Sequence, residues 1–349
     1  MNEPKKSTKK RGRLNKFLLL ILTVAVIFIG LNWPTNYYIE MPGSAVSTGQ
    51  FMRSNSKAPN NFYLVTVSET SQPASVWQYL FSFTQKHVSR VPKEELLGSA
   101  TNSQYQELQN WYMETSQQNA IYCAAKKAGL KPKLHYQGVY VMQVQKGSSF
   151  RKKLQIGDTV LGANGHRFRS TAEMINYLQK RKIGSKVQIT VLREQKKIAF
   201  TGKIVKVKGT GKPGIGIQLV EHTKVETKPK LTINAGDIGG PSAGLMFTLT
   251  SYEIFSGEHL AKGHKIAGTG TITPSGKVGI IGGVDKKVVA ADKAGAEVFF
   301  APTDTGGLKK SANNYVVAKK TAKQIGTKMK IVPVRTFDDA LNYLRKNFK

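Results

Sequence analysis

The hydrophobic pattern begins with a long apolar run near the N-terminus. No charged residue occurs from Phe17 to Ile39, and apolar residues dominate the first two thirds of this stretch. At about 1.5 Å per residue, the run is long enough for one membrane-spanning helix, with Trp33, Tyr37 and Tyr38 at its far interface. The pattern therefore predicts a transmembrane helix over residues 17–34.

The same run is also compatible with a cleaved signal peptide. Such a peptide needs a small-residue site of the A-x-A kind directly after the apolar run, and Gly30-Leu31-Asn32 is a poor match. An uncleaved anchor is therefore favoured. Residues 1–16 carry seven basic side chains and one acidic side chain, and basic flanks stay on the cytoplasmic side. We expect a basic cytoplasmic tail over residues 1–16 and everything after the helix to be extracellular.

The remaining pattern predicts a mixed α+β fold, with α/β-like alternation in its last part. Extended patterns predict strands at residues 37–41, 62–67, 138–144 and 186–193, and helical periodicity predicts helices at residues 104–128 and 170–181. From residue 215 onward, strand-like and helix-like runs alternate. These runs cover residues 231–233, 241–255, 265–273, 284–294, 298–301, 330–334 and 337–347.

The middle of the chain resembles a bacterial PDZ domain. The segment GVYVMQVQKGSSF, followed by LQIGDTVLGANG, matches that family's pattern of strand and Gly-Asp and Asn-Gly turns. We assign residues 131–210 to a PDZ-like domain. The resemblance implies a peptide-binding module with a carboxylate-binding loop at 136–139, a receiving strand at 139–144 and a groove helix at 171–178. The implied peptide-binding residues are Gln137, Gly138, Val139, Tyr140 and Val141. The alternative is a module that packs against its neighbour and binds nothing.

A candidate nucleophile lies in the segment from Asp237 to Gly244, which reads DIGGPSAG and leads into an apolar helix. Proline fits the first turn of a helix, so Ser242 is expected inside that turn and not at the capping position before it. A helix N-terminus with nearby glycines also offers free N–H groups to a developing oxyanion. The candidate donors are the loop residues Gly239, Gly240 and Ala243.

A candidate base lies on the helix expected at residues 284–294. Helical periodicity places Asp285, Lys286, Asp292 and Lys293 on one polar arc. Lys287 falls on the opposite arc, among alanines and valines. A lysine held among apolar side chains loses hydration, and this favours a neutral amine that can take a proton from serine. The alternative is a lysine whose stem merely covers the helix flank.

Together the two segments resemble the Lon-type peptidase domain, which has its serine in G-P-S-A-G and its lysine in G-G-[hydrophobic]-x-x-K. Ser242 and Lys287 occupy these positions, and IAGTGTITPSGKVGIIGGV between them follows the family. The resemblance implies that Thr269 orients the lysine. Two departures matter: Gly239 replaces an acidic residue common in Lon enzymes, and the contribution of nearby Asp237 is left open.

With its anchor and PDZ module, the whole chain resembles the membrane-bound, PDZ-containing Lon-like proteases of Gram-positive bacteria. Residues 211–349 then form the Ser-Lys peptidase domain. In that group the PDZ module interrupts the catalytic fold, which implies that residues 35–130 contribute partly to the peptidase. No GxxxxGK[ST] loop occurs, so ATP-driven unfolding is not expected. The expected substrates are secreted or surface-exposed polypeptides, and an oligomer is left open.

Composition narrows the partners. The formal net charge of +32 would attract nucleic acid, anionic lipid or acidic wall polymers, but a solvated basic surface is the favoured interpretation. No motif supports specific nucleic-acid recognition. The single cysteine, Cys123, allows no intramolecular disulfide and is expected to be buried. Neither a metal nor another cofactor is expected.

Two rival functions are a Ser-His-Asp esterase, because G-x-S-x-G fits a nucleophile elbow with His259 or His264 downstream, and a non-catalytic PDZ adaptor.

Overall fold

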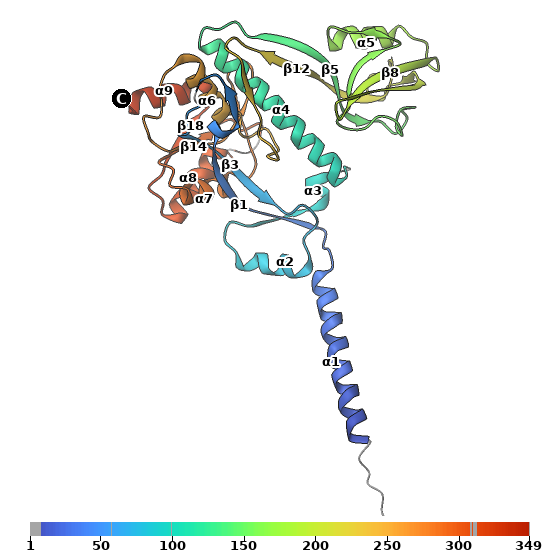
Figure 1. The fold of residues 1–349 in the computed structure, drawn as a ribbon, viewed down its shortest axis with the longest axis vertical. Coiled ribbons are helices and arrows are strands. Elements are labelled where there is room, and N and C mark those ends of the chain that lie inside the picture. The colour runs from blue at the N-terminus through green and yellow to red at the C-terminus, as the bar shows by residue number, and fades with distance from the viewer. Residues whose placement is uncertain (1–7, 57, 99, 308, 310–312, 349) are drawn as a thin grey trace, which may run out of the picture. The chain divides into compact units, whose positions relative to one another are not determined.

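The computed structural model describes residues 8–348 except 57, 99, 308 and 310–312 (Figure 1). The start of the predicted basic tail, residues 1–7, therefore lies outside the described residues. The chain divides into two compact units, which are treated one at a time below. The first comprises Met1–Pro42 and Val67–Ser99, and the second comprises Gly43–Thr66 and Ala100–Lys349.

The first unit contains the N-terminal helix and a small α/β segment. Helix α1 (Thr8–Asn32) is followed by the start of strand β1 (Tyr37–Ser47), which pairs antiparallel with β4 (Ser89–Pro92). Between them lie α2 (Val76–Phe81) and a 3₁₀ turn at Ser82–Thr84, and α3 (Lys93–Leu97) follows β4. The predicted apolar helix is confirmed. Its stretch Asn15–Asn32 is long and apolar enough to cross a bilayer, a property that a signal sequence shares.

The second unit is built on parallel strands between two helical layers. Strand β14 (Ile266–Gly268) pairs in parallel with both β3 (Phe62–Glu69) and β17 (Val298–Pro302), and β17 pairs with β18 (Lys330–Val334). Because side chains alternate along a strand, Phe62 and Leu64 enter one core while Val65 enters the other. The first core is formed with α4 (Asn102–Lys127), α6 (Gly244–Ser256) and α9 (Phe337–Asn347), and the second with α7 (Val284–Lys293) and α8 (Asn314–Ile325).

Short strands complete this part of the unit. Strand β2 (Met52–Ser54) pairs with β13 (Leu231–Ile233), and β15 (Thr271–Ile272) pairs with β16 (Val278–Gly279). Cys123 is buried on α4 as expected, and its burial raises the thiol pKa to about 11. At that pKa the sulfur is protonated at neutral pH, which fits a structural thiol and not a nucleophile.

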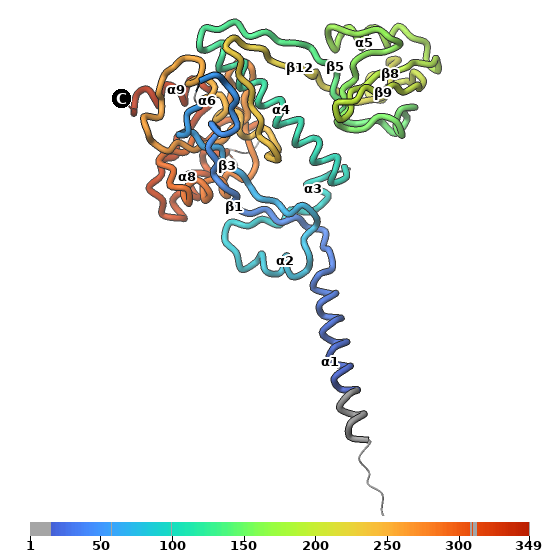
Figure 2. Tube along the Cα trace, viewed as in Figure 1, coloured from blue at the N-terminus to red at the C-terminus, as the bar shows by residue number. Residues whose placement is uncertain are grey.

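The PDZ-like segment forms its own sheet, with strand order β12-β5-β6-β8-β9. Its strands are β5 (Lys133–Val144), β6 (Thr159–Ala163), β8 (Lys186–Arg193), β9 (Lys196–Lys203) and β12 (Ile217–Glu226). Short strands β7 (His166–Arg167), β10 (Val205–Lys206) and β11 (Pro213–Gly214) lie at its margins. Helix α5 (Thr171–Gln179) packs on the sheet through Met174 and Leu178. The tube in Figure 2 shows this helix beside strands β8 and β9.

Most of the elements predicted from periodicity are confirmed. Strands β8, β13 and β18 and helix α9 have the predicted bounds, and helix α4 begins two residues earlier than the pattern indicated. Helix α8 was not predicted, and α6 begins three residues later than expected. The mixed α+β class is therefore correct.

Helix α4 lies close to the start of α6 at Gly244. A Cβ atom at this position would lie 2.7 Å from Ile272 Cγ2 and 2.8 Å from Ser116 Oγ, and 2.9 Å from the Ile272 backbone nitrogen. The last contact involves main chain, so a flexible side chain cannot relieve it. Gly244 is therefore required by the close packing of three segments.

We expect Gly244→Ala to lower the free energy of unfolding by about 1–3 kcal/mol, because overpacking a buried contact displaces its neighbours. The measurement is the thermal unfolding midpoint of the detergent-solubilised full chain. Gly282→Ala is the matched control, since a Cβ atom there meets nothing within 4 Å. Equal midpoints for the two variants would contradict the prediction.

Candidate active site

Ser242 lies in a turn just before α6, so the prediction that it sits inside the first helical turn is wrong. The physical reason is that this segment bonds to the chain after β14 instead of continuing the helix. The Ser242 carbonyl accepts hydrogen bonds from Gly270 N at 2.8 Å and Thr269 Oγ1 at 3.1 Å. Leu245 N in turn donates to the Gly270 carbonyl at 3.0 Å. Gly270 has φ +150°, a conformation that glycine adopts without strain.

Helix α4 supports the serine loop from the other side. The Gln109 carbonyl accepts a hydrogen bond from Gly240 N at 2.9 Å, and Ser116 Oγ donates to the Pro241 carbonyl at 3.0 Å. Asn119 Nδ2 donates to the Ile272 carbonyl at 3.0 Å. Sequence reasoning missed these positioning residues, because α4 carries no chemical motif and its contacts with the loop are long-range. The only signal in the sequence is the high content of Gln and Asn in α4, because such amides can bond the backbone of a neighbouring loop.

The amine of Lys287 reaches the serine hydroxyl. Its Nζ lies 3.0 Å from Ser242 Oγ and 2.6 Å from the Val65 carbonyl of β3. Lys287 is 4% exposed, in agreement with the apolar arc inferred from periodicity. Lys286 is also buried, although the same periodicity placed it on the polar arc. The solvent-facing arc of α7 is therefore narrower than periodicity predicts, because it does not include Lys286.

Burial is the cause of the altered basicity of Lys287. Loss of hydration disfavours the charged ammonium and lowers the pKa of Lys287 to about 8. A neutral amine has one lone pair and two N–H donors. If an N–H is given to the Val65 carbonyl, the lone pair remains available for the Ser242 hydroxyl proton. This arrangement suits an amine that acts as a general base on serine.

The backbone donors near Ser242 are not equally available. Gly240 N–H is already bonded to the Gln109 carbonyl, so the structure does not support its expected role as an oxyanion donor. Within the described part of the chain, the N–H groups of Gly239, Ser242 and Ala243 have no such acceptor. These groups remain candidates for stabilising an oxyanion.

The other polar candidates for the site are Thr269, Asp237 and His264. Thr269 is fully buried and bonds the Ser242 carbonyl, so its observed contact is with the serine loop and not with the lysine. Asp237 is exposed. His264 pairs with Glu297 at 2.8 Å. Among described side chains, the partner of Ser242 Oγ is Lys287 Nζ and not a histidine. Nor does any cluster of three or more His, Cys, Asp and Glu residues in the described ranges suit a metal ion.

The expected peptide-receiving strand of the PDZ-like segment is already paired on both sides. Residues 136–139, expected to form a loop, lie inside the continuous strand β5. There β12 pairs with β5 on one edge, with Val139 opposite Glu221 and Val141 opposite Leu219, and β6 pairs on the other. Thr171 Oγ1 at the start of α5 donates to Glu221 Oε2 at 3.1 Å. The chain's own β12 therefore occupies the edge to which a peptide would add. Tyr140 is paired on both sides, Gly138 is paired with His222 of β12, and Gln137 lies at the register irregularity between Tyr136 and Gly138.

Comparison with known proteins finds two family models that match parts of this chain. Residues 127–204 match the family model of the PDZ domain, and residues 187–346 match that of the C-terminal proteolytic domain of Lon protease. The Lon protease of Metamycoplasma arthritidis is 36% identical over 105 residues, which are 30% of this chain and 11% of that protein. The Lon protease of Malacoplasma penetrans is 34% identical over 107 residues, 31% of this chain and 12% of that protein.

Among solved structures, the PDZ domain of an SdrC-like protein from Listeria monocytogenes is 35% identical, with a TM-score of 0.24. The match covers 25% of this chain and 93% of that domain. The two family-model matches identify a PDZ domain and a Lon-type proteolytic domain in one chain. One apolar helix precedes both. The matched part of the chain spans only 11–12% of the length of these two Lon proteases.

The pKa of Lys287 predicts the pH dependence of any reaction in which it is the base. Below about pH 8 the amine is protonated and cannot accept the serine proton, so kcat/KM should rise with pH and level off above this value. At neutral pH the rate should be roughly tenfold below the plateau. The measurement is kcat/KM for a fluorogenic peptide across this range. A rise centred near the ordinary lysine pKa, or a fall over this range, would contradict the assignment.

Proposed function

We propose that the chain is an ATP-independent, membrane-anchored serine endopeptidase whose nucleophile is Ser242 and whose general base is Lys287. The observation that carries this proposal is the 3.0 Å separation between Ser242 Oγ and a buried Lys287 amine. The base is shielded from water while the nucleophile is only half-buried. A peptide carbonyl can then approach the hydroxyl without hydrating the amine.

The proposed reaction has two steps. Ser242 Oγ attacks the scissile carbonyl carbon while its proton moves to Lys287 Nζ, and the resulting ammonium donates that proton to the leaving amine. The product is an ester between Ser242 and the acyl half of the peptide. Lys287 then takes a proton from water, which attacks the ester, and the proton returns to Ser242 Oγ as the acid product leaves. The free N–H groups of Gly239 and Ala243 are the proposed oxyanion donors.

Extended peptides and flexible segments are the proposed substrates. No GxxxxGK[ST] loop supplies an ATP-driven unfolding step in this sequence, so a folded substrate would have to open by itself. The basic N-terminal flank supports a cytoplasmic N-terminus and an extracellular catalytic unit. The poor A-x-A match after α1 supports an uncleaved anchor. Together these features favour secreted or surface-exposed polypeptides as substrates.

Replacement of either dyad member should remove activity and leave the fold intact. We expect Ser242→Ala and Lys287→Ala each to lower kcat/KM for peptide cleavage by more than about a thousandfold, because neither group acts without the other. Lys293→Ala is the matched control, since Lys293 is an exposed lysine on the same helix. Activity is measured on the detergent-solubilised full chain, with circular dichroism as the check on folding.

The rival functions predict different outcomes. If His264→Ala removes cleavage and Lys287→Ala does not, an esterase-type triad is correct and the dyad is not. If the wild-type chain binds peptides but cleaves none over the whole pH range, the adaptor interpretation is correct. Retained cleavage in Ser242→Ala would remove the serine mechanism altogether.

Recruitment of substrate by the PDZ domain is the second part of the proposal. Strand addition to β5 requires a peptide to displace β12, since β12 holds that edge. The chain's own strand therefore competes with substrate. The hydrogen bond from Thr171 of α5 to Glu221 of β12 helps to hold β12 in place. A single substitution that removes this bond should therefore favour the peptide over β12.

We expect Glu221→Ala to raise the affinity for an extended peptide by up to about fivefold, the equivalent of one hydrogen bond of about 1 kcal/mol. The measurement is fluorescence polarisation with peptides selected on the full chain from a displayed library. Gln218→Ala, at another exposed position of β12, is the matched control. Equal affinities in the two variants would show that β12 does not compete, and a failure to select any peptide would remove the recruitment role.

A further inference from the structure

Helix α2 turns an apolar face toward solvent. Trp77, Leu80 and Phe81 follow the i, i+3, i+4 spacing of one helix face, and Phe83 follows in the 3₁₀ turn. These four side chains are 46–60% exposed. A surface helix of a globular protein normally shows the opposite pattern, with its apolar face inward. This set of residues is called the α2 patch below.

The inner side of α2 is fixed to the rest of the first unit. The Tyr79 ring packs against the Tyr37 ring of β1, with 4.9 Å between ring centroids. In the 3₁₀ turn after α2, Arg90 donates a hydrogen bond to the Ser82 carbonyl at 3.1 Å. Its guanidinium group also lies over the Phe83 ring at 4.0 Å, although this ring is mostly exposed. Outward exposure of the α2 patch is therefore a consequence of packing on the other side and not of a loosely attached helix.

The α2 patch is continuous with the end of α1. Val76 N, the first residue of α2, donates to the Trp33 carbonyl at 3.0 Å, and Thr35 N donates to the Ala74 carbonyl at 2.8 Å. Trp33 itself is 65% exposed. Figure 1 shows α2 running across the axis of α1 at its C-terminal end. If α1 crosses a bilayer, α2 lies along the membrane surface at the level of Trp33.

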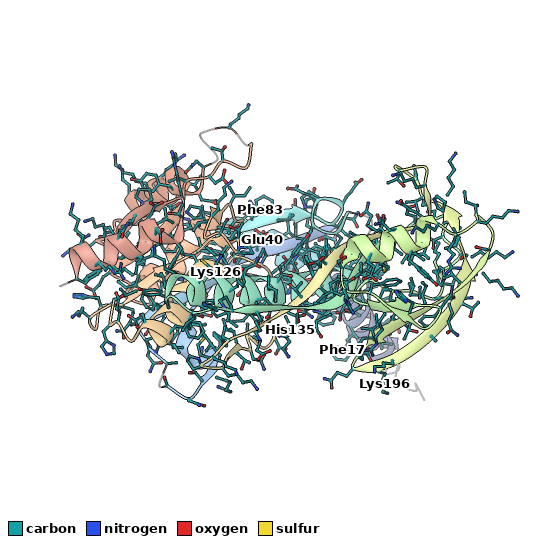
Figure 3. The ribbon with its side chains drawn as sticks, turned by 90° about the horizontal axis from the view of Figure 1, so that it is seen from above. Phe17, Glu40, Phe83, Lys126, His135 and Lys196 are labelled. Atoms are coloured by element: carbon teal, nitrogen blue, oxygen red, sulfur yellow. The ribbon has the colours of Figure 1, made fainter. Side chains whose placement is uncertain are left out.

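Charge in this segment fits the same surface. From residue 70 to residue 93 there is no acidic side chain, while Lys86, Arg90 and Lys93 are basic. Aromatic residues favour the membrane–water interface, and basic residues favour anionic headgroups. Phe83 is one of the side chains labelled in Figure 3.

We propose that the α2 patch is a second membrane contact, in which α2 inserts its apolar face into the outer boundary between headgroups and acyl chains. The proposal rests on the membrane anchoring by α1 proposed above. An apolar helix face of this kind is buried about 5–10 Å into the interface. With α1 and α2 both in contact with the membrane, the first unit cannot tilt freely about α1. A single anchoring helix alone does not restrict this tilt.

Tryptophan fluorescence tests the contact directly, because the chain has only three tryptophans. Full-length variants that keep one of them, with the other two changed to phenylalanine, are reconstituted into phosphatidylcholine–phosphatidylglycerol vesicles. The vesicles carry bromine, a quencher, either near the headgroups or deep in the acyl chains. Bromine near the headgroups should remove most of the Trp77 emission, and deep bromine should remove less. Trp111, which is 9% exposed in the second unit, serves as the unquenched control.

The variant that keeps Trp33 separates this proposal from the anchor. Quenching of Trp33 without quenching of Trp77 overturns the α2 contact and leaves the anchor standing. Quenching of neither overturns both. A Trp77 emission shifted to shorter wavelength but insensitive to bromine shows that protein, such as a second copy of this chain, covers the patch, and this also overturns the proposal.

A polar change in the patch gives an independent readout. In the variant that keeps only Trp77, Phe81→Ser should shift emission to longer wavelength and reduce quenching, because the helix face loses apolar area that drives insertion. Ile183→Ser is the matched control, since Ile183 is an exposed aliphatic residue of the second unit. Both positions are exposed, so folding should be unaffected, and circular dichroism checks this. Equal quenching in the two variants overturns the proposal.

Discussion

The site depends on the removal of one lysine amine from water. Lys287 would be an ordinary cation if its helix faced solvent, and Ser242 would then have no base within reach. In the proposed mechanism, burial supplies the proton acceptor without a histidine or a carboxylate, since desolvation alone accounts for the lowered pKa of Lys287. The Val65 carbonyl then satisfies an N–H of the buried amine, which would otherwise be costly to enclose.

This constraint explains why the site needs segments from distant parts of the sequence. The carbonyl comes from β3, ahead of the PDZ domain, while the amine and the hydroxyl come from segments behind it. Helix α4, also ahead of the PDZ domain, bonds the serine loop through Gln109 and Ser116. Neither flank of the PDZ domain contains the complete site, so the peptidase core must form across the insertion. Contacts between residues far apart in the sequence raise the contact order, and folding is slower for such topologies.

The sequence predicted which two side chains meet better than it predicted their surroundings. Ser242 and Lys287 could be selected because each stands in a short local pattern, and their helices and strands follow clear periodicity. The contact between Lys287 and Val65 could not be selected, because a backbone carbonyl carries no residue-type signal. Thr269 was assigned to the lysine by resemblance, yet its hydroxyl bonds the Ser242 carbonyl. Ser242 was placed inside α6 because proline suits a first helical turn, but bonds to Gly270 compete with helix formation there.

Helix α4 contacts both the serine loop and the PDZ sheet, two features that the periodicity of the sequence does not connect. On one side it supports the serine loop, and on the other it contacts the paired strands of the PDZ sheet. Tyr140 of β5 donates to the Glu107 carbonyl at 3.1 Å, and Gln118 of α4 accepts a hydrogen bond from Val225 N of β12 at 2.8 Å. Displacement of β12 would therefore break a contact to the same helix that holds the loop of the nucleophile. Because the two sets of bonds lie along one helix, the proposed peptide binding and the position of Ser242 would depend on the same structural element.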